Sequence, residues 1–210
     1  MYSNLTIIHN SLAENLLGIL RNKDTSASDF RMALDRLGHI LVIEALKNSP
    51  TETIEIETLL EKTEAKKLKG ETVIIPILRA GLSMLSACLY FLPNAQIGFI
   101  GQKRDEETAL AQEYYRNLPD LKNKEILIID PVLATGGSAI ATIKALLEKN
   151  ASVEQIKLLC ILAAPEGVKA LELNFPDLQI ITVSLERELN EKKYILPGLG
   201  DAGDLWAGLS

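Results

Sequence analysis

The sequence predicts an α/β fold in which a mostly parallel central sheet is flanked by helices. Short apolar runs rich in β-branched residues alternate with segments whose apolar residues recur at helical spacing. The runs at 73–78 and 126–129 contain no polar residue, as expected of parallel strands buried on both faces. The 210 residues, of which 47% are hydrophobic, can bury one sizeable core, so we expect a single domain over residues 1–210.

The first third of the chain predicts two helices and an exposed arm. Apolar residues recur at helical intervals over 10–21 and 28–46, and Ser28 is suited to cap the second helix. Residues 53–59 alternate apolar and acidic side chains, which favours a strand in a β-hairpin arm. Residues 62–69 are rich in lysine and interrupted by Glu64, which is typical of a solvated loop or helix face.

The pattern of the chain from residue 73 onward predicts the strands of the sheet, the helices that cover it and a small hood. The polar stretch 102–118 predicts a projecting loop that can cover a site, and the tail 189–210 predicts a small hood over the crevice. The expected strands are 73–78, 97–100, 126–129, 156–162 and 178–183, and the expected helices are 81–91, 138–149 and 167–173.

The segment 126–138 carries the clearest chemical signal. Asp130 stands where a buried strand ends, and ligands of open α/β sheets bind at that edge. Residues 135–138, Thr-Gly-Gly-Ser, can turn several N–H groups around an anion at the start of a helix. The segment matches neither a Walker loop nor Gly-x-Gly-x-x-Gly, and a ribose monophosphate fits it better. Taken alone, these residues could also be a plain strand-to-helix turn.

Residues 130–138 resemble the PRPP (phosphoribosyl pyrophosphate) loop of the type I phosphoribosyltransferase family, in the form found in its uracil branch. Pro131 stands where most of the family has a second acid. Four further segments are similar to family motifs: 77–83 to the pyrophosphate loop, 104–108 to the arginine-bearing loop, 194–204 to the uracil-binding segment, and 163–167 to a short shared motif. The tail from Leu205 to Ser210 departs from the family's usual basic and aromatic ending.

The resemblance implies the type I phosphoribosyltransferase fold and transfer of ribose phosphate from PRPP to uracil, giving UMP and pyrophosphate. Magnesium is the implied cofactor, held mainly by PRPP and water rather than by a protein cage. The implied catalytic residues are Asp130, Arg104 and Asp201. The implied uracil-binding residues are Ile195, Gly200, Asp201 and Ala202. The implied PRPP-binding residues are Arg79, Arg104, Asp130, Pro131, Val132, Leu133, Ala134, Thr135, Gly136, Gly137, Ser138 and Asp201.

The residue types suit these roles. A carboxylate such as Asp130 can accept hydrogen bonds from the two ribose hydroxyls, and the guanidinium groups of Arg79 and Arg104 fork onto pyrophosphate oxygens. Either arginine could instead be a surface charge. Asp201 is a candidate general base for the uracil N1 proton, with backbone and water contacts as the alternative.

Composition limits the partners and the compartment. The net charge of −6 disfavours nonspecific nucleic-acid binding. The uncharged stretch 80–102 is interrupted by polar residues and is too short in its apolar part for a membrane helix of about 20 residues. We expect no signal peptide, no membrane partner and a cytoplasmic location, since Cys88 and Cys160 are predicted to be core thiols. His9 and His39 have no neighbours at zinc-ligand spacing.

Two other functions stay open. One is a type I phosphoribosyltransferase for another base, and the other is a noncatalytic nucleotide-sensing protein on the same fold. The 194–204 pattern favours the uracil enzyme, and this acidic chain lacks the basic face expected of an RNA-binding regulator. The exposed arm and the resemblance predict a homodimer or higher homo-oligomer. Whether GTP is an effector is not decided by the sequence.

Overall fold

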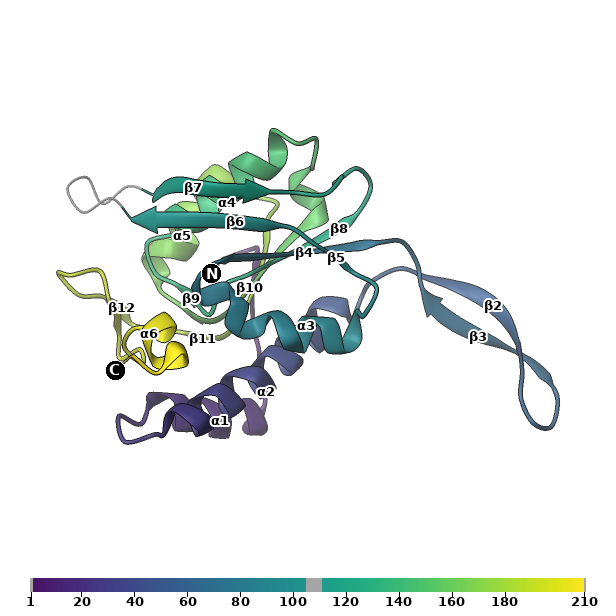
Figure 1. The fold of residues 1–210 in the computed structure, drawn as a ribbon, viewed down its shortest axis with the longest axis horizontal. Helices are drawn as coiled ribbons and strands as arrows, with labels where there is room; N and C mark the ends of the chain where they lie inside the picture. The colour runs from purple at the N-terminus through teal and green to yellow at the C-terminus, as the bar shows by residue number, and fades with distance from the viewer. Residues whose placement is uncertain (1, 105–110, 210) are drawn as a thin grey trace.

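The fold is built on a mostly parallel sheet in a computed structural model that describes residues 2–104 and 111–209. Within these ranges nine strands form the main sheet (Figure 1). Neighbouring strands are parallel except for the last pair, β6 and β7. The order across the sheet is β1 (Leu5–Ile7), β11 (Gln179–Leu185), β10 (Ile156–Ala163), β8 (Glu125–Ile129), β4 (Thr72–Leu78), β6 (Phe99–Arg104) and β7 (Ala111–Asn117), while β5 (Gln96–Ile97) pairs with β4 and β9 (Val132–Leu133) with β10.

Strand β8 illustrates why the sheet is covered on both faces. Ile126 and Ile128 belong to one apolar cluster and Leu127 and Ile129 to the other, because successive side chains of a strand point to opposite faces. The cluster of Leu127 is covered by α1 (Ser11–Arg21), α2 (Ala27–Leu46) and α3 (Leu85–Phe91), and that of Ile126 by α4 (Gly137–Leu147) and α5 (Pro165–Asn174). The predicted fold class is confirmed.

The second helix begins earlier than the sequence predicts. Ser26 is the cap of α2, since its backbone is extended and its hydroxyl accepts a hydrogen bond from the N–H of Asp29 at 3.1 Å. Ser28 lies inside the first turn, so the prediction that Ser28 caps this helix is wrong. Asn10 caps α1 in the same way, accepting from the N–H groups of Leu12 and Ala13.

The predicted arm is present as a hairpin of β2 (Thr51–Glu57) and β3 (Lys62–Leu68), which projects far from the sheet (Figure 1). Leu59 and Leu60 at its tip are fully exposed. The prediction of a loop or helix face over 62–69 is wrong, because this segment pairs with β2 along its length. A two-stranded ribbon in water needs no apolar face, so β3 lacks the alternation that identifies a strand.

The prediction of a projecting loop over 102–118 is wrong for most of its length. β6 and β7 pair antiparallel and extend the sheet, and residues 105–110 lie outside the described part. Arg116 of β7 donates to Glu148, the C-cap of α4, at 2.7 Å, which links the two elements, and to Glu113 of its own strand at 2.8 Å. Four of the seven residues of β7, Gln112, Glu113, Arg116 and Asn117, are polar, which gives this edge strand the composition of a loop.

The last residues form a hood at the edge of the sheet where the parallel strands end (Figure 1). It consists of a short hairpin of β12 (Glu188–Leu189) and β13 (Ile195–Leu196) followed by α6 (Ala202–Ala207). The stretch 80–102 forms the 3-10 helix η1 (Ala80–Met84), then α3, β5 and the start of β6. In the part of the chain that is described, no helix combines the length and apolarity needed to cross a membrane.

Replacing the cap of α2 should destabilise the protein. We expect Ser26→Ala to lower the free energy of unfolding by about 1 kcal/mol, because the N–H of Asp29 loses its acceptor. Ser28→Ala is the matched control and should change it by less than about 0.5 kcal/mol. Urea unfolding measures both values, and equal effects would contradict the assignment of the cap.

Candidate active site

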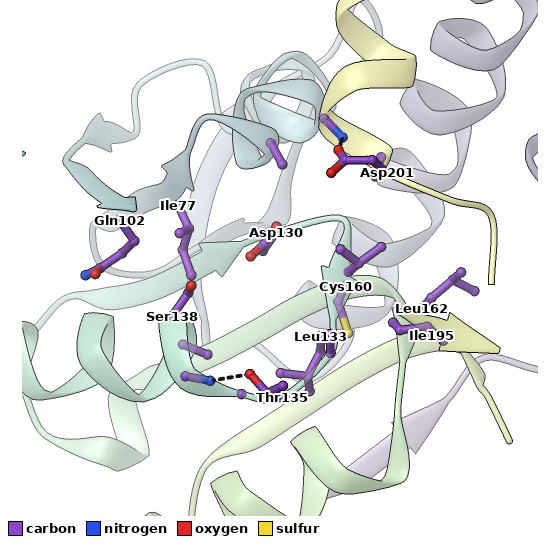
Figure 2. A pocket seen from close by; sticks show the side chains of 18 of the residues that line it. Ile77, Gln102, Asp130, Leu133, Thr135, Ser138, Cys160, Leu162, Ile195 and Asp201 are labelled. Carbon is purple, nitrogen blue, oxygen red and sulfur yellow. Dashed lines mark hydrogen bonds between the residues drawn. The ribbon is translucent and has the colours of Figure 1, made fainter. Parts of the chain in front are cut away.

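A cavity of about 360 Å³ lies at the edge of the sheet where β4, β8 and β10 end (Figure 2). Three segments form its walls: the turn after β4, the loop between β8 and α4, and the hood. Since the strands are parallel, their carboxyl ends meet at this edge, which is where ligands bind in open α/β sheets. The Arg79 turn, the loop after Asp130 and the hood, which the sequence predicted to form one site, therefore converge on this cavity.

Asp130 lies on the wall of the cavity directly after β8. Its backbone N–H donates to the carbonyl of Leu159 at 3.2 Å, which continues the pairing of β8 with β10. Burial raises the pKa of the Asp130 carboxyl to about 7, while a hydrogen bond from the backbone N–H of Val132 opposes the rise. A ligand that donates hydrogen bonds to this carboxyl would favour its charged form.

The loop from Ala134 to Ser138 brings backbone N–H groups to the cavity. Gly136 precedes α4 with φ of +83°, a left-handed conformation that favours glycine. The hydroxyl of Thr135 accepts from the N–H of Gly137 at 3.4 Å, as the dashed line in Figure 2 shows. The remaining N–H groups of the first turn of α4, with the hydroxyl of Ser138, can bind an anion at the positive end of the helix.

The loop is supported from behind by α5. A Cβ atom on Gly167 would lie 2.4 Å from the carbonyl oxygen of Ala134, so only glycine allows α5 to pack this closely. Gly167 belongs to the short motif at 163–167, for which the sequence suggested no task. Its place in the fold explains the motif as a support for the loop between β8 and α4.

Among the predicted PRPP-binding residues whose side chains are described, Pro131 is the one that does not line the cavity. It is buried, and its carbonyl oxygen accepts from the N–H groups of Ile161 at 2.9 Å and Leu162 at 3.1 Å. Pro131 therefore anchors the loop to β10. Val132, Leu133 and Ala134, which follow it, do line the cavity.

Arg79 reaches the cavity from the turn between β4 and η1. Its side chain is exposed, and the residue lines the cavity. The turn lies against the end of β8, since a Cβ atom on Gly81 would be 2.4 Å from the carbonyl oxygen of Ile129. This close approach sets Arg79 beside the loop that begins at Asp130.

The hood contributes Ile195, Gly200, Asp201 and Ala202 to the cavity, as predicted for a common site. Gly200 has φ of +92°. Asp201 caps α6, because its Oδ1 atom accepts from the N–H groups of Gly203 at 2.9 Å and Asp204 at 3.0 Å. Figure 2 shows Asp201 above Asp130 across the cavity. The capping role was not predicted, although an Asp three residues before another acid, Asp204, is a recognisable signal.

Several lining residues were not predicted. The floor of the cavity is apolar, and burial raises the pKa of the Cys160 thiol to about 12, so this group stays neutral. Lys193, at the tip of the hood hairpin with φ of 65°, adds a cation to the lining. The strand residues of the floor are Ile77, Leu158, Cys160 and Leu162, which sequence patterns do not separate from ordinary core positions.

Arg104 is the last residue of β6, and its side chain lies outside the described part of the chain, as do residues 105–108. Its predicted role stays a prediction. Within the described residues, no group of three or more His, Cys, Asp or Glu side chains is arranged to hold a metal ion.

The chain is similar in sequence and structure to known proteins. A family model described as uracil phosphoribosyltransferase matches residues 7–206. The uracil phosphoribosyltransferase of Lactococcus lactis is 45% identical over 204 residues, covering 96% of this chain and 97% of that protein. The uracil phosphoribosyltransferase of Streptococcus pneumoniae is 46% identical over 202 residues, covering 95% of this chain and 96% of that protein.

The chain is also similar to solved structures. The AQ2163 protein from Aquifex aeolicus has a TM-score of 0.92 and 40% identity, covering 98% of this chain and 99% of that one. An adenine phosphoribosyl transferase from Trypanosoma brucei has a TM-score of 0.62 at 14% identity, covering 94% and 88%, which is a similarity of fold alone.

Adding one methyl group behind the loop should disturb it. We expect Gly167→Ala to lower the free energy of unfolding by about 1–3 kcal/mol, because the new Cβ would overlap the carbonyl of Ala134. Gly18→Ala is the control: nothing lies within 4 Å of its added Cβ, and alanine should stabilise α1 by up to about 1 kcal/mol. Thermal and urea unfolding measure both; a neutral Gly167→Ala would argue against the close contact.

Proposed function

The chain belongs to the uracil phosphoribosyltransferase family, and from this premise we propose that it transfers the ribose phosphate group of PRPP to N1 of uracil, giving UMP and pyrophosphate. The observation that carries the proposal is the convergence on one cavity of the Asp130 loop, the Arg79 turn and the hood. The loop supplies a carboxylate and N–H groups for the ribose phosphate, the turn supplies a guanidinium for pyrophosphate, and the hood supplies backbone amides for uracil.

The ribose phosphate binds to the loop between β8 and α4 in this proposal. The Asp130 carboxylate accepts hydrogen bonds from the two ribose hydroxyls, and the 5-phosphate lies against the N–H groups and hydroxyls of residues 134–138. Binding the diol favours the charged form of Asp130 and so lowers the raised pKa. Pro131 acts through the loop, because it does not face the cavity.

Pyrophosphate, the leaving group, is bound by arginine. Arg79 lines the cavity beside the Asp130 loop, and Arg104 at the end of β6 is proposed to join it. A permanently charged guanidinium stabilises the negative charge that develops on pyrophosphate as its bond to the sugar breaks.

Magnesium fits the oxygen donors of this site. We assign its ligands mainly to PRPP and water, since Mg²⁺ usually keeps several waters and binds substrate phosphates. The carboxylate of Asp201, a hard oxygen donor that lines the cavity, would contact PRPP or a water bound to the ion. When bound, the ion would neutralise part of the pyrophosphate charge.

Uracil is recognised in this proposal by the backbone of the hood. Ile195 and the segment from Gly200 to Ala202 present amide groups to the base, and small residues permit a close approach. N1 forms the bond to the sugar as the bond to pyrophosphate breaks, and the N1 proton leaves to Asp201 or to water. The Oδ1 atom of Asp201 is engaged in the cap of α6, so Oδ2 is the oxygen available for the proton.

A base panel tests the proposed function. With PRPP and magnesium, we expect UMP and pyrophosphate from uracil and no turnover of cytosine, hypoxanthine, adenine or orotate. Turnover of another base alone would keep the fold and overturn the specificity. Saturable PRPP binding without any turnover would support the nucleotide-sensing alternative. The same assay with and without GTP tests whether GTP is an effector.

The pH dependence should report Asp130. The pKa near 7 means that the carboxylate, the form that accepts the ribose hydroxyls, declines tenfold per pH unit at lower pH. We therefore expect kcat/KM for PRPP to fall as the pH drops below about 7. Asp130→Asn should lower kcat/KM about 10–100-fold and abolish this step. A pH dependence caused by ionisation of PRPP would remain in Asp130→Asn. The comparison of the variant with the wild type therefore separates the titration of Asp130 from that of PRPP.

We propose that the chain forms a homo-oligomer through its arm, because Leu59 and Leu60 are fully exposed at the tip. Replacing both by Ser should shift the protein towards monomers in light scattering. Leu173→Ser, at an exposed position on α5, is the control and should leave the mass unchanged. A monomeric wild-type protein would contradict the proposal.

A further inference from the structure

Glu186 is a buried carboxylate outside the cavity, directly after β11. Its side chain is 1% exposed, and its backbone N–H donates to the carbonyl of Ala163 at 2.8 Å, which continues the pairing with β10. A buried carboxylate is costly unless it is paired and hydrogen-bonded. The hydrogen-bond and ion-pair partners of Glu186 therefore indicate which parts of the fold this carboxylate connects.

These partners come from three different parts of the fold. The hydroxyl of Ser184, in β11, donates to Oε1 at 2.6 Å, and Arg21, the last residue of α1, forms an ion pair with the same oxygen. The N–H of Gly198, in the hood, donates to Oε2 at 3.0 Å. One carboxylate thus connects the end of a central strand and a covering helix to the hood.

Gly198 is the point at which this connection reaches the proposed uracil-binding backbone. It has φ of +59°, and a Cβ atom there would lie 2.2 Å from the carbonyl oxygen of Ile195. The turn from Ile195 to Gly198 is therefore compact, and holding the N–H of Gly198 also holds Ile195. Gly200 and Asp201 follow two and three residues later and line the same cavity.

We propose that Glu186 is a positioning residue for base recognition, which holds the hood turn in place through the N–H of Gly198 and is itself held by Arg21 and Ser184. This inference rests on the proposed function, because it concerns the base-binding side of the same cavity. The PRPP-binding loop between β8 and α4 makes no contact with Glu186 among its hydrogen bonds in the described residues. Loss of Glu186 should therefore affect the base more than PRPP.

Glu186→Gln is the main test, since it keeps the size of the side chain and removes the charge that Arg21 and the N–H of Gly198 share. We expect KM for uracil to rise about tenfold and KM for PRPP to change less than about twofold. Arg21→Met should raise KM for uracil in the same direction, and Arg21→Lys should restore most of the loss because it keeps the cation. Arg187→Gln is the matched control: it removes a neighbouring ion pair with Glu188 that is mostly exposed, and both KM values should stay unchanged.

Hydrogen exchange of the hood gives a second readout that needs no turnover. Residues 195–201 should exchange faster in Glu186→Gln than in the wild type, while residues 130–138 should exchange at an unchanged rate. Equal rises in both KM values, or a lower melting temperature with normal KM for uracil, would reduce Glu186 to a general structural role and overturn the inference. Unchanged exchange in the hood would also overturn it.

The outcome is separable from that of the proposed function. If the wild type uses another base, the KM comparison is made with that base. A rise in KM for the base that exceeds the change in KM for PRPP would support the inference, and equal changes would overturn it. If the wild type turns over no base, hood exchange alone decides. If Glu186→Gln does not fold, Arg21→Met and Arg21→Lys give the same comparison.

Discussion

The parallel pairing of the central strands is the constraint on which the rest of the structure depends. β8 pairs in parallel with β4 on one side and β10 on the other, and its side chains are buried on both faces. These three strands therefore end at one edge, and the loops that follow them must meet there. A shift of β8 by one residue would exchange the faces of its side chains, so the register of the strand determines where Asp130 lies.

Close backbone contacts then fix the loops at this edge relative to one another. Gly81 lies against the carbonyl of Ile129, and Gly167 lies against the carbonyl of Ala134. At both places the absence of a side chain lets one loop rest on the next. The groups that face the cavity are thus held before a ligand enters, which is the condition for stabilising charge that develops during a reaction.

Sequence patterns predicted the elements whose environment is uniform. β4, β8 and β10 are buried on both faces, so uninterrupted apolar runs identified them. Prediction was wrong where the surroundings decide the conformation. β3 is a strand because it pairs with β2 in water, and β7 is a strand because it pairs with β6 at the edge of the sheet; neither requires an apolar pattern.

The sequence by itself determined the fold class, and it predicted a binding loop from Asp130 to Ser138, because the residues of that loop are consecutive and follow a buried strand. Only the tertiary structure decided that Pro131 does not line the cavity, that Asp201 caps α6 and that Gly167 supports the loop. The link from Arg21 to Glu186 joins residues 165 apart in the chain. Local patterns carry no information on such a pair, since it forms only when packing of α1 on the sheet brings the two side chains together.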